Sequence, residues 1–197
     1  MPEAQEHLEQ AEHAEHAAGW SKKIALLIAV LALFLSFSET LGKSAQTEAI
    51  SGNVESSNLW AFFQAKTIRM TVLRTAAEGL KLESASASDP AIKGAMDKQI
   101  DTWQKTVARY DSEPETGEGR KQLTERAKHT EEQRDLAMAR YHHYELASAA
   151  FQIGIVLASA AVITSMVALA WFAGALGVAG AVVLAFGLFA PHAVHLV

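Results

Sequence analysis

The sequence predicts an all-α integral membrane protein with three transmembrane helices and a long helical extramembrane domain between the first and the second. Residues 147–190 contain no charged residue and no histidine, and this stretch is long enough to cross a bilayer twice if it turns once. Residues 24–37 form another apolar run. Between these runs, about a hundred residues show helical spacing of apolar side chains, which is enough chain for a small helical domain.

Residues 1–19 are rich in alanine, glutamate and histidine and contain almost no large apolar side chain. We therefore expect an acidic tail that is frayed or disordered. His13 and His16 are three residues apart and would share one helical face, beside glutamates that could complete a divalent-metal site. We favour a solvated tail and treat these two histidines as weak metal candidates.

The first predicted span covers residues 20–41, because its polar ends can reach the headgroup region around the apolar core. Polar residues precede it and no small-residue cleavage site follows it, so we expect a retained anchor and not a cleaved signal peptide. Lys22 and Lys23 are the only basic residues outside residues 42–146. Long loops carry little weight in the positive-inside rule. Lys43, Arg134 and Arg140 flank the spans on the loop side and nearly balance the basic pair. Because the long loop counts for less, we favour an N-terminus inside a bacterial inner membrane and a loop domain outside it.

The extramembrane domain, residues 42–146, is expected to begin with a helix at residues 44–81. Apolar residues recur at helical spacing at Ile50, Val54, Ala61, Ala65, Ile68 and Val72, and the stripe is widened by Leu59, Phe62, Phe63, Leu73 and Leu80. This pattern predicts an amphipathic helix with the stripe as its packing face. The block from Trp60 to Phe63 is apolar on so many sides that we expect several neighbours around it, including other subunits.

Two further helices are expected at residues 90–111 and 120–146. Asp89 can cap the first of these, and Pro90 suits its first turn. Its apolar residues recur three or four positions apart, at Ile92, Met96, Ile100, Trp103, Val107 and Tyr110. The second follows a heptad seam through Leu123, Ala127, Thr130, Ala137, Tyr141 and Tyr144. The three loop helices are expected to pack as an antiparallel bundle or coiled coil.

The C-terminal hairpin is predicted as spans at residues 147–172 and 174–190, with a turn at Ala173 and Gly174 because glycine tolerates most backbone conformations. A short tail, residues 191–197, follows. Small residues recur four positions apart in the pairs Gly154 with Ala158, Ala160 with Thr164, Ala173 with Gly177 and Gly177 with Ala181. Such spacing predicts close helix packing within the membrane.

Two polar residues near the membrane boundary are candidates for a functional role. Glu39 lies at the far end of the first span, and Gln152 lies near the start of the second. A carboxylate inside a span would indicate an ion or proton pathway, whereas an interfacial Glu39, which we favour, would contact water. We expect Gln152 to hydrogen-bond to another helix.

Residues 58–69 read NLWAFFQAKTIR. This block resembles the W-A-F-[FY]-Q-A-K-x-I-R pattern of the bacterial membrane proteins grouped as domain of unknown function 4337. The acidic tail, the basic pair before the first span and the order of span, helical loop and hairpin fit the same family. The resemblance implies this membrane architecture and brings no known activity. Phe63 stands where the pattern usually has tyrosine, so a hydroxyl is missing there.

The same block supplies six candidate interaction residues: Trp60, Phe62, Phe63, Gln64, Lys66 and Arg69. Its three polar members could recognise an anion or a lipid headgroup beside the aromatic rings. Alternatively, the rings pack in a helix interface while the two basic side chains snorkel or pair with glutamates of a neighbouring helix. We favour the packing interpretation, and neither interpretation implies catalysis.

Several classes of function lack their sequence signatures. The chain has no cysteine and a net charge of −5, which excludes thiolate metal sites and argues against nucleic-acid binding. It also contains no Gly-rich phosphate loop, nucleophile elbow or H-E-x-x-H motif. We therefore expect no catalytic residue, no bound cofactor and no nucleic-acid partner.

The sequence as a whole favours a non-enzymatic multi-pass membrane protein. Its expected partners are the lipid bilayer and either copies of itself or other membrane proteins, with a role as a scaffold or accessory subunit. A second hypothesis is an oligomeric channel or transporter component that uses Glu39 and Gln152. The third is a metal-binding sensor that uses the tail histidines.

Overall fold

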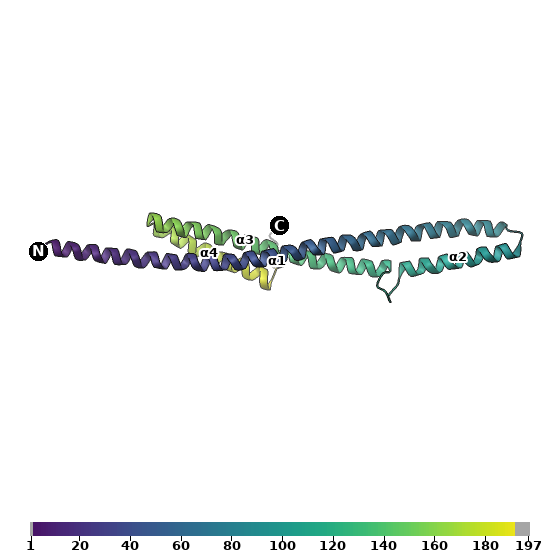
Figure 1. Ribbon diagram of the computed structural model, residues 1–197, viewed down its shortest axis with the longest axis horizontal. Helices are drawn as coiled ribbons and strands as arrows, with labels where there is room; N and C mark the ends of the chain where they lie inside the picture. Colours follow the sequence, from purple (N-terminus) through teal and green to yellow (C-terminus); the bar gives the residue numbers. More distant parts are fainter. Residues whose placement is uncertain (1, 192–197) are drawn as a thin grey trace. The chain divides into compact units, whose positions relative to one another are not determined.

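The computed structural model describes the backbone of residues 2–191 and the side-chain surroundings from residue 19 onward. These residues form four helices and no strand: α1 (Pro2–Ser86), α2 (Pro90–Asp111), α3 (Arg120–Thr164) and α4 (Val167–Phe189) (Figure 1). The all-α prediction is confirmed. Helices α1, α3 and α4 are each long and apolar enough to cross a membrane, which indicates a membrane protein.

Helix α1 runs without a break through the segments predicted as the acidic tail, the first span and the first loop helix. Its only proline is Pro2, at the first turn, where a missing N–H removes no helical hydrogen bond. Glycines inside the helix cost only about 1 kcal/mol each relative to alanine. The acidic tail is thus the first part of α1, although the side chains of His13 and His16 lie outside the described residues.

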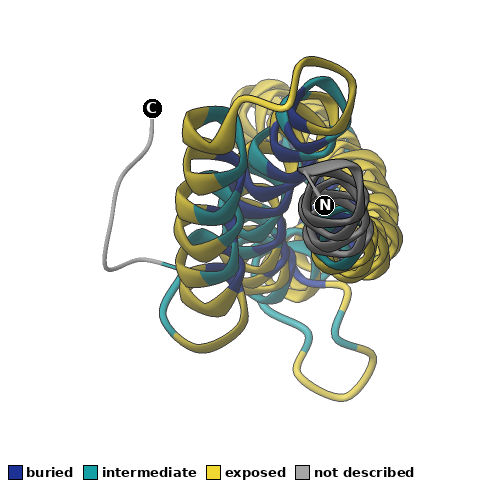
Figure 2. Cartoon of the chain, turned by 90° about the vertical axis from the view of Figure 1, so that its left-hand side faces the viewer, coloured by how far each residue is buried: buried dark blue, intermediate teal, exposed yellow. Residues whose placement is uncertain are grey.

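The chain divides into two compact units. The span unit consists of Met1–Glu48 and Leu136–Val197, and the loop unit consists of Ala49–Asp135. Helices α1 and α3 each contribute a segment to both units. In Figure 2, the buried residues lie on the sides of helices that face other helices, and exposed residues cover the outer sides.

The core of the span unit is built from α1, α3 and α4. One cluster of buried residues contains Leu31, Ala45, Tyr144, Ala147, Phe151 and Leu184, and another contains Ile24, Ala158, Ala161 and Ala173. Two hydrogen bonds link the three helices: Ser38 Oγ donates to the Tyr144 carbonyl at 2.8 Å, and the Tyr144 hydroxyl donates to the Gly187 carbonyl at 3.2 Å. Tyr144 therefore contacts both neighbouring helices at one level of the core.

The turn of the hairpin differs from the prediction. Helix α3 ends at Thr164 and α4 begins at Val167, so the turn lies at Ser165 and Met166, whereas Ala173 and Gly174 are inside α4. No glycine is needed, because Ser165 itself adopts a φ of 56°. The Met166 N–H donates to Thr164 Oγ1 at 3.4 Å. Ala173 is instead buried against α1 and α3.

Small residues allow α4 to approach its neighbours closely, as the sequence predicts in general terms. Gly154, Ala158 and Ala173 are buried. Gly180 and Gly187, which were not singled out, are also buried. A Cβ added at Gly180 would lie 2.9 Å from Cε1 of Phe151, and one at Gly187 would lie 2.7 Å from Cε1 of Tyr144. Both rings are themselves buried, so they have little room to move.

Replacing Gly180 by alanine should destabilise the span unit. Overpacking against a buried ring costs roughly 1–3 kcal/mol, so we expect a lower melting temperature for the full chain in mild detergent, followed by circular dichroism. The matched control is Gly174→Ala, where an added Cβ has no atom within 4 Å and helix propensity should favour alanine. Equal melting temperatures for the two variants would contradict the proposed close contact with Phe151.

The loop unit contains the last part of α1, all of α2 and the first part of α3. Helix α2 has the bounds that the sequence predicts, and the Asp89 carboxylate accepts a hydrogen bond from the Ala91 N–H at 2.8 Å as its N-cap. Ser84 Oγ donates to Asp97 Oδ1 at 2.8 Å and links α1 to α2. Of the predicted apolar stripe of α2, Ile100 is buried whereas Ile92 is exposed.

The packing face of α1 in the loop unit matches the predicted stripe only in part, at Leu59, Phe63, Leu73 and Leu80. The residues that face α2 and α3 form the inner seam, whose positions alternate three and four residues apart and are buried or half-buried: Gly52, Ser56, Leu59, Phe63, Lys66, Met70, Leu73, Ala77, Leu80 and Ser84. The stripe that contains Ile50, Val54, Ile68 and Val72 is exposed. This part of the prediction is wrong because four polar or glycine residues occupy the inner seam, so hydrophobic spacing also favoured the other side. On α3, by contrast, the predicted seam is buried at Leu123, Ala127, Thr130, Ala137 and Tyr144.

Candidate functional site

The aromatic block of α1 packs against α3 in the loop unit. Leu59 forms a buried cluster with Leu123 and Ala127, and the rings of Trp60 and Phe63 lie against it. These two rings meet edge to face, with centroids 5.5 Å apart and an interplanar angle of 81°. This arrangement suits the quadrupoles of aromatic rings.

The indole of Trp60 also makes a polar contact. Its Nε1–H donates to Oε1 of Glu131 on α3 at 2.8 Å. A half-buried indole is stabilised by a partner for its N–H. The packing interpretation therefore describes Trp60 and Phe63 well.

Lys66 is a buried cation at the centre of this region. Only 4% of the residue is exposed, and Nζ lies 3.7 Å from Oε2 of Glu113 and 3.7 Å from Oε2 of Glu118. The ammonium also lies 5.2 Å from the Phe62 ring centroid and 5.4 Å from that of Tyr110. A buried charge without partners would be very costly, and these carboxylates and rings compensate it.

The carboxylates of Glu113 and Glu118 belong to the loop between α2 and α3. The Glu113 N–H donates to the Gln122 side-chain oxygen at 3.1 Å, and the Gly117 N–H donates to the Glu113 carbonyl at 3.0 Å. Gly117 has a φ of 68°, which glycine adopts without strain. Gly119 is buried, and a Cβ there would overlap the Gln122 side chain and the Glu113 backbone. The sequence SEPETGEG thus forms a closed turn that faces α1.

A second cation, Arg120, borders the same region. Its guanidinium carbon lies 4.8 Å from the Phe63 ring centroid, and Nη1 lies 3.6 Å from Oδ1 of Asp111. The adjacent aromatic residues of α1 therefore each contact a cation, because Lys66 lies over Phe62 and Arg120 over Phe63. Such contacts are worth about 0.5–2 kcal/mol each, depending on exposure.

The polar residues of the aromatic block do not converge on one anion site. Lys66 is buried and faces two carboxylates, whereas Gln64 and Arg69 are exposed on other sides of α1. The Lys66 charge is therefore compensated within the chain. Arg69 makes no salt bridge among the described residues, so the expected pairing applies only to Lys66, and its partners come from the loop.

The intramembrane polar candidates are brought together in the span unit. Gln152 Nε2 donates to Glu39 Oε1 at 3.4 Å, across 113 residues of sequence. Both residues are exposed, and Glu39 lies near the end of the apolar run of α1. Gln152 thus hydrogen-bonds to another helix, as the sequence predicts, and this helix belongs to the same chain.

The histidines do not form a metal site within the described residues. No group of three or more His, Asp or Glu side chains that could hold a metal ion is found between residues 19 and 191. His143 is buried and its Nδ1 lies 2.8 Å from the Ala139 carbonyl, whereas the half-buried His142 lies 4.0 Å from Glu145. The side chains of His13 and His16 are outside the described part of the chain.

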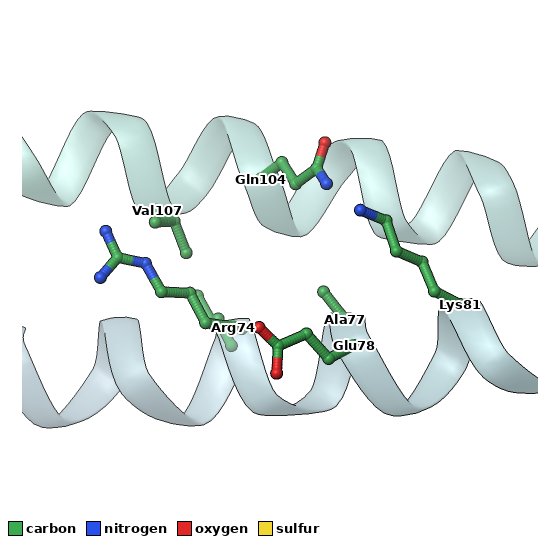
Figure 3. A pocket seen from close by; sticks show the side chains of 7 residues that line it. Arg74, Ala77, Glu78, Lys81, Gln104 and Val107 are labelled. Carbon is green, nitrogen blue, oxygen red and sulfur yellow. The ribbon is translucent and has the colours of Figure 1, made fainter.

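A shallow cavity of about 190 Å³ lies between α1 and α2 in the loop unit. Figure 3 shows Arg74, Glu78 and Lys81 on one helix and Gln104 and Val107 on the other. Sequence patterns did not indicate this cavity. It is smaller than the roughly 300–1,000 Å³ of typical ligand pockets, and it has no nucleophile beside a base.

The order of segments and the aromatic block agree with one known family. A family model matches residues 20–190, which include all three candidate spans and the loop unit. The chain belongs to the family described as domain of unknown function (DUF4337). No curated protein and no solved structure matches the chain significantly. The DUF4337 match confirms the resemblance carried by residues 58–69, and the description of the family names no activity.

Replacing Lys66 by methionine should destabilise the loop unit, because Glu113 and Glu118 would lose the buried cation that compensates them. Glu118 would keep no salt bridge among the described residues, and Glu113 would keep only that with the exposed Arg109. Loss of the buried cation between them costs roughly 1–3 kcal/mol, measured as a lower melting temperature of the full chain. The control is Lys105→Met. Lys105 pairs only with Asp101, its side chain is 76% exposed, and its loss should cost no more than about 0.5 kcal/mol. A Lys66→Met protein as stable as the Lys105 variant would refute a stabilising role for this cluster.

Proposed function

We propose that this DUF4337 protein is a non-enzymatic, self-associating scaffold or accessory subunit in a bacterial inner membrane. The surface that supports this proposal is the exposed apolar stripe of α1 in the loop unit, which we call the outer seam. Its apolar members are Val54, Ala61, the half-buried Ala65, Ile68, Val72 and Leu82, and the polar Asn58 lies among them.

The outer seam has the spacing of a coiled coil. Val54, Ala61 and Ile68 are seven residues apart, and Leu82 continues the series fourteen residues later. Asn58, Ala65 and Val72 form a second seven-residue series, offset by four. Apolar residues at positions a and d of a heptad allow one helix to insert its side chains between those of another.

The outer seam is unoccupied within the chain. Its large members are strongly exposed: Val54 by 55%, Ile68 by 64%, Val72 by 60% and Leu82 by 75%. The other side of the same helix is already covered by α2 and α3 through the inner seam. The seam is apolar from Ala61 to Val72, and Thr75 and Gly79 interrupt it before Leu82. An exposed apolar stripe of this kind on a monomer would favour association.

A second copy of the chain is the partner that fits best. Copies inserted in one membrane share the same orientation, and α1 continues without a break from the span into the loop unit. Their α1 helices would therefore run parallel, and each outer seam would meet its own equivalent. Asn58 would then face its symmetry mate, and a single asparagine at an a position fixes register and subunit number in coiled coils.

The exposed polar residues of the aromatic block acquire a role in this arrangement. Gln64 and Arg69 flank the outer seam at positions g and e, which lie next to each other across a parallel pair. Arg69 would donate hydrogen bonds to the Gln64 side chain of the other copy. Two heptads further on, Glu78 and Glu83 occupy the corresponding positions and would repel each other, so the seam is expected to hold mainly between Val54 and Val72.

Replacing Ile68 and Val72 together by aspartate should abolish self-association of the protein extracted in mild detergent. Each lost apolar contact is worth about 1.5–3 kcal/mol, which weakens association by at least about a hundredfold. The measurement is native mass with identification of co-purifying chains. The control is Asn53→Asp, an exposed position beside the seam that should leave the mass unchanged.

The same measurement separates the two forms of the proposal. A wild-type homo-oligomer that becomes monomeric in the double variant supports self-association. A different protein bound to wild type and lost from the variant supports the accessory-subunit role. A wild-type monomer without partners, or an assembly unaffected by the two aspartates, would count against the outer seam as an association surface.

The proposed orientation has the N-terminus inside and the loop unit outside. It is supported by Lys22 and Lys23, which are exposed at the start of the apolar run of α1 and would remain on the cytoplasmic side.

A further inference from the structure

A cavity of about 270 Å³ lies between α1 and α3 in the span unit. Among its lining residues, those with polar groups available for a ligand are Glu39, Lys43, Gln46, Tyr141, Glu145 and Ser148. On α1, the first three recur four and three residues apart. On α3, the last three do the same. Two polar helical faces therefore meet at this cavity.

The cavity lies where the apolar segments of both helices end. The apolar run of α1 ends just before Glu39, and the uncharged stretch of α3 begins just after Glu145. Residues at such positions are found at the depth of lipid headgroups. The volume suits a headgroup rather than a complete lipid, whose acyl chains would contact exposed apolar residues of the spans such as Phe37 and Ile153.

The charges of the lining are largely uncompensated. Glu39 accepts one long hydrogen bond of 3.4 Å from Gln152, and Glu145 lies 4.0 Å from the His142 ring. Within the described residues, no lysine or arginine forms a salt bridge with either carboxylate, and Lys43 forms none. The site thus offers two carboxylates from facing helices and one ammonium a turn away from Glu39.

We propose that this cavity binds the headgroup of a zwitterionic phospholipid that carries a primary ammonium and a phosphate. The ligand ammonium would lie between Glu39 and Glu145, and the phosphate would lie against Lys43. Each charge of the ligand then meets an opposite charge of the protein, in charge-assisted hydrogen bonds.

The chemistry of the site selects among headgroups. A primary ammonium donates three hydrogen bonds, which two carboxylates and the Ser148 hydroxyl can accept, whereas a quaternary ammonium donates none. An anionic glycerol headgroup has no cation to compensate the two carboxylates, and it would be repelled by them. The Tyr141 hydroxyl is a further hydrogen-bond donor in the lining.

The test is native mass spectrometry of the full chain in mild detergent, with equal amounts of phosphatidylethanolamine, phosphatidylcholine and phosphatidylglycerol added. We expect the ethanolamine lipid to be retained about tenfold better than the glycerol lipid, which corresponds to one charge-assisted hydrogen bond. Equal retention of all three lipids would overturn the proposal.

Matched variants locate the binding. The double variant Glu39→Gln, Glu145→Gln should lose the preference, and Lys43→Ala should weaken retention of all three phosphate-bearing lipids. The control is Glu48→Gln, because Glu48 lines a different cavity with Arg140. An ethanolamine preference that persists in the double variant, with circular dichroism like that of wild type, would also overturn the proposal.

A competition experiment with free phosphoethanolamine distinguishes a membrane lipid from a soluble headgroup as the ligand. If millimolar phosphoethanolamine displaces the lipid, the charged groups alone provide the affinity. If it does not, the acyl chains are required and the ligand is a membrane lipid. Both results require the ethanolamine preference to be present first, and neither depends on the oligomeric state.

Discussion

Helix α1 buries one face along most of its length, and the rest of the fold depends on this constraint. Seven-residue steps from Ile24 through Leu31, Ser38, Ala45, Gly52, Leu59 and Lys66 all fall on buried or half-buried positions. Helices with such a repeat pack side by side with their side chains interdigitated. In the span unit the repeat is occupied mostly by small or apolar residues, and in the loop unit it also includes a charged one. The same seven-residue spacing of buried positions thus occurs in a mostly apolar core and around a buried cation.

The charged position explains why the loop between α2 and α3 is ordered. Lys66 occupies a buried step of the repeat, and it is compensated by Glu113 and Glu118 from that loop. Gly117 and Gly119 permit the tight backbone that brings both carboxylates to α1. This polar cluster restricts how α1, α2 and α3 can pack, because a shift of register would leave the ammonium buried without partners.

The sequence was sufficient to predict an all-α chain, three segments apolar enough to cross a membrane, and the family. It was not sufficient to place the hairpin turn, because residues 147–190 contain no charged residue that would mark one. Ser165 adopts a positive φ, which the residue type does not predict. The sequence also predicted the packing face of α1 only in part. The inner seam contains Gly52, Ser56 and Lys66, which count as polar or neutral, whereas the exposed outer seam contains β-branched apolar residues. Only the positions of α2, α3 and their loop decide between the two faces.

The surroundings of the candidate-site residues were also predicted only in part, because they depend on where α2, α3 and their loop lie. Trp60 and Phe63 pack against α3, as their large apolar rings favour, whereas Phe62 remains exposed. The partners of Lys66 could not be predicted, since they lie 47 and 52 residues away in a turn with no periodic pattern. The exposed members, Gln64 and Arg69, flank the outer seam, and their positions connect the block to the proposed self-association.

The central claim is that α1 has a second, intermolecular seam, and cysteine cross-linking in native membranes tests it most directly. The chain has no cysteine of its own, so single substitutions report one position each. We predict disulfide-linked dimers for cysteine at Val54, Ala61 and Ile68, since equivalent core positions of parallel helices lie close enough to bridge. Cysteine at the exposed off-seam positions Asn53 and Lys81 should remain unlinked. Cross-linking that is absent at the seam, or equally strong off it, would contradict the account.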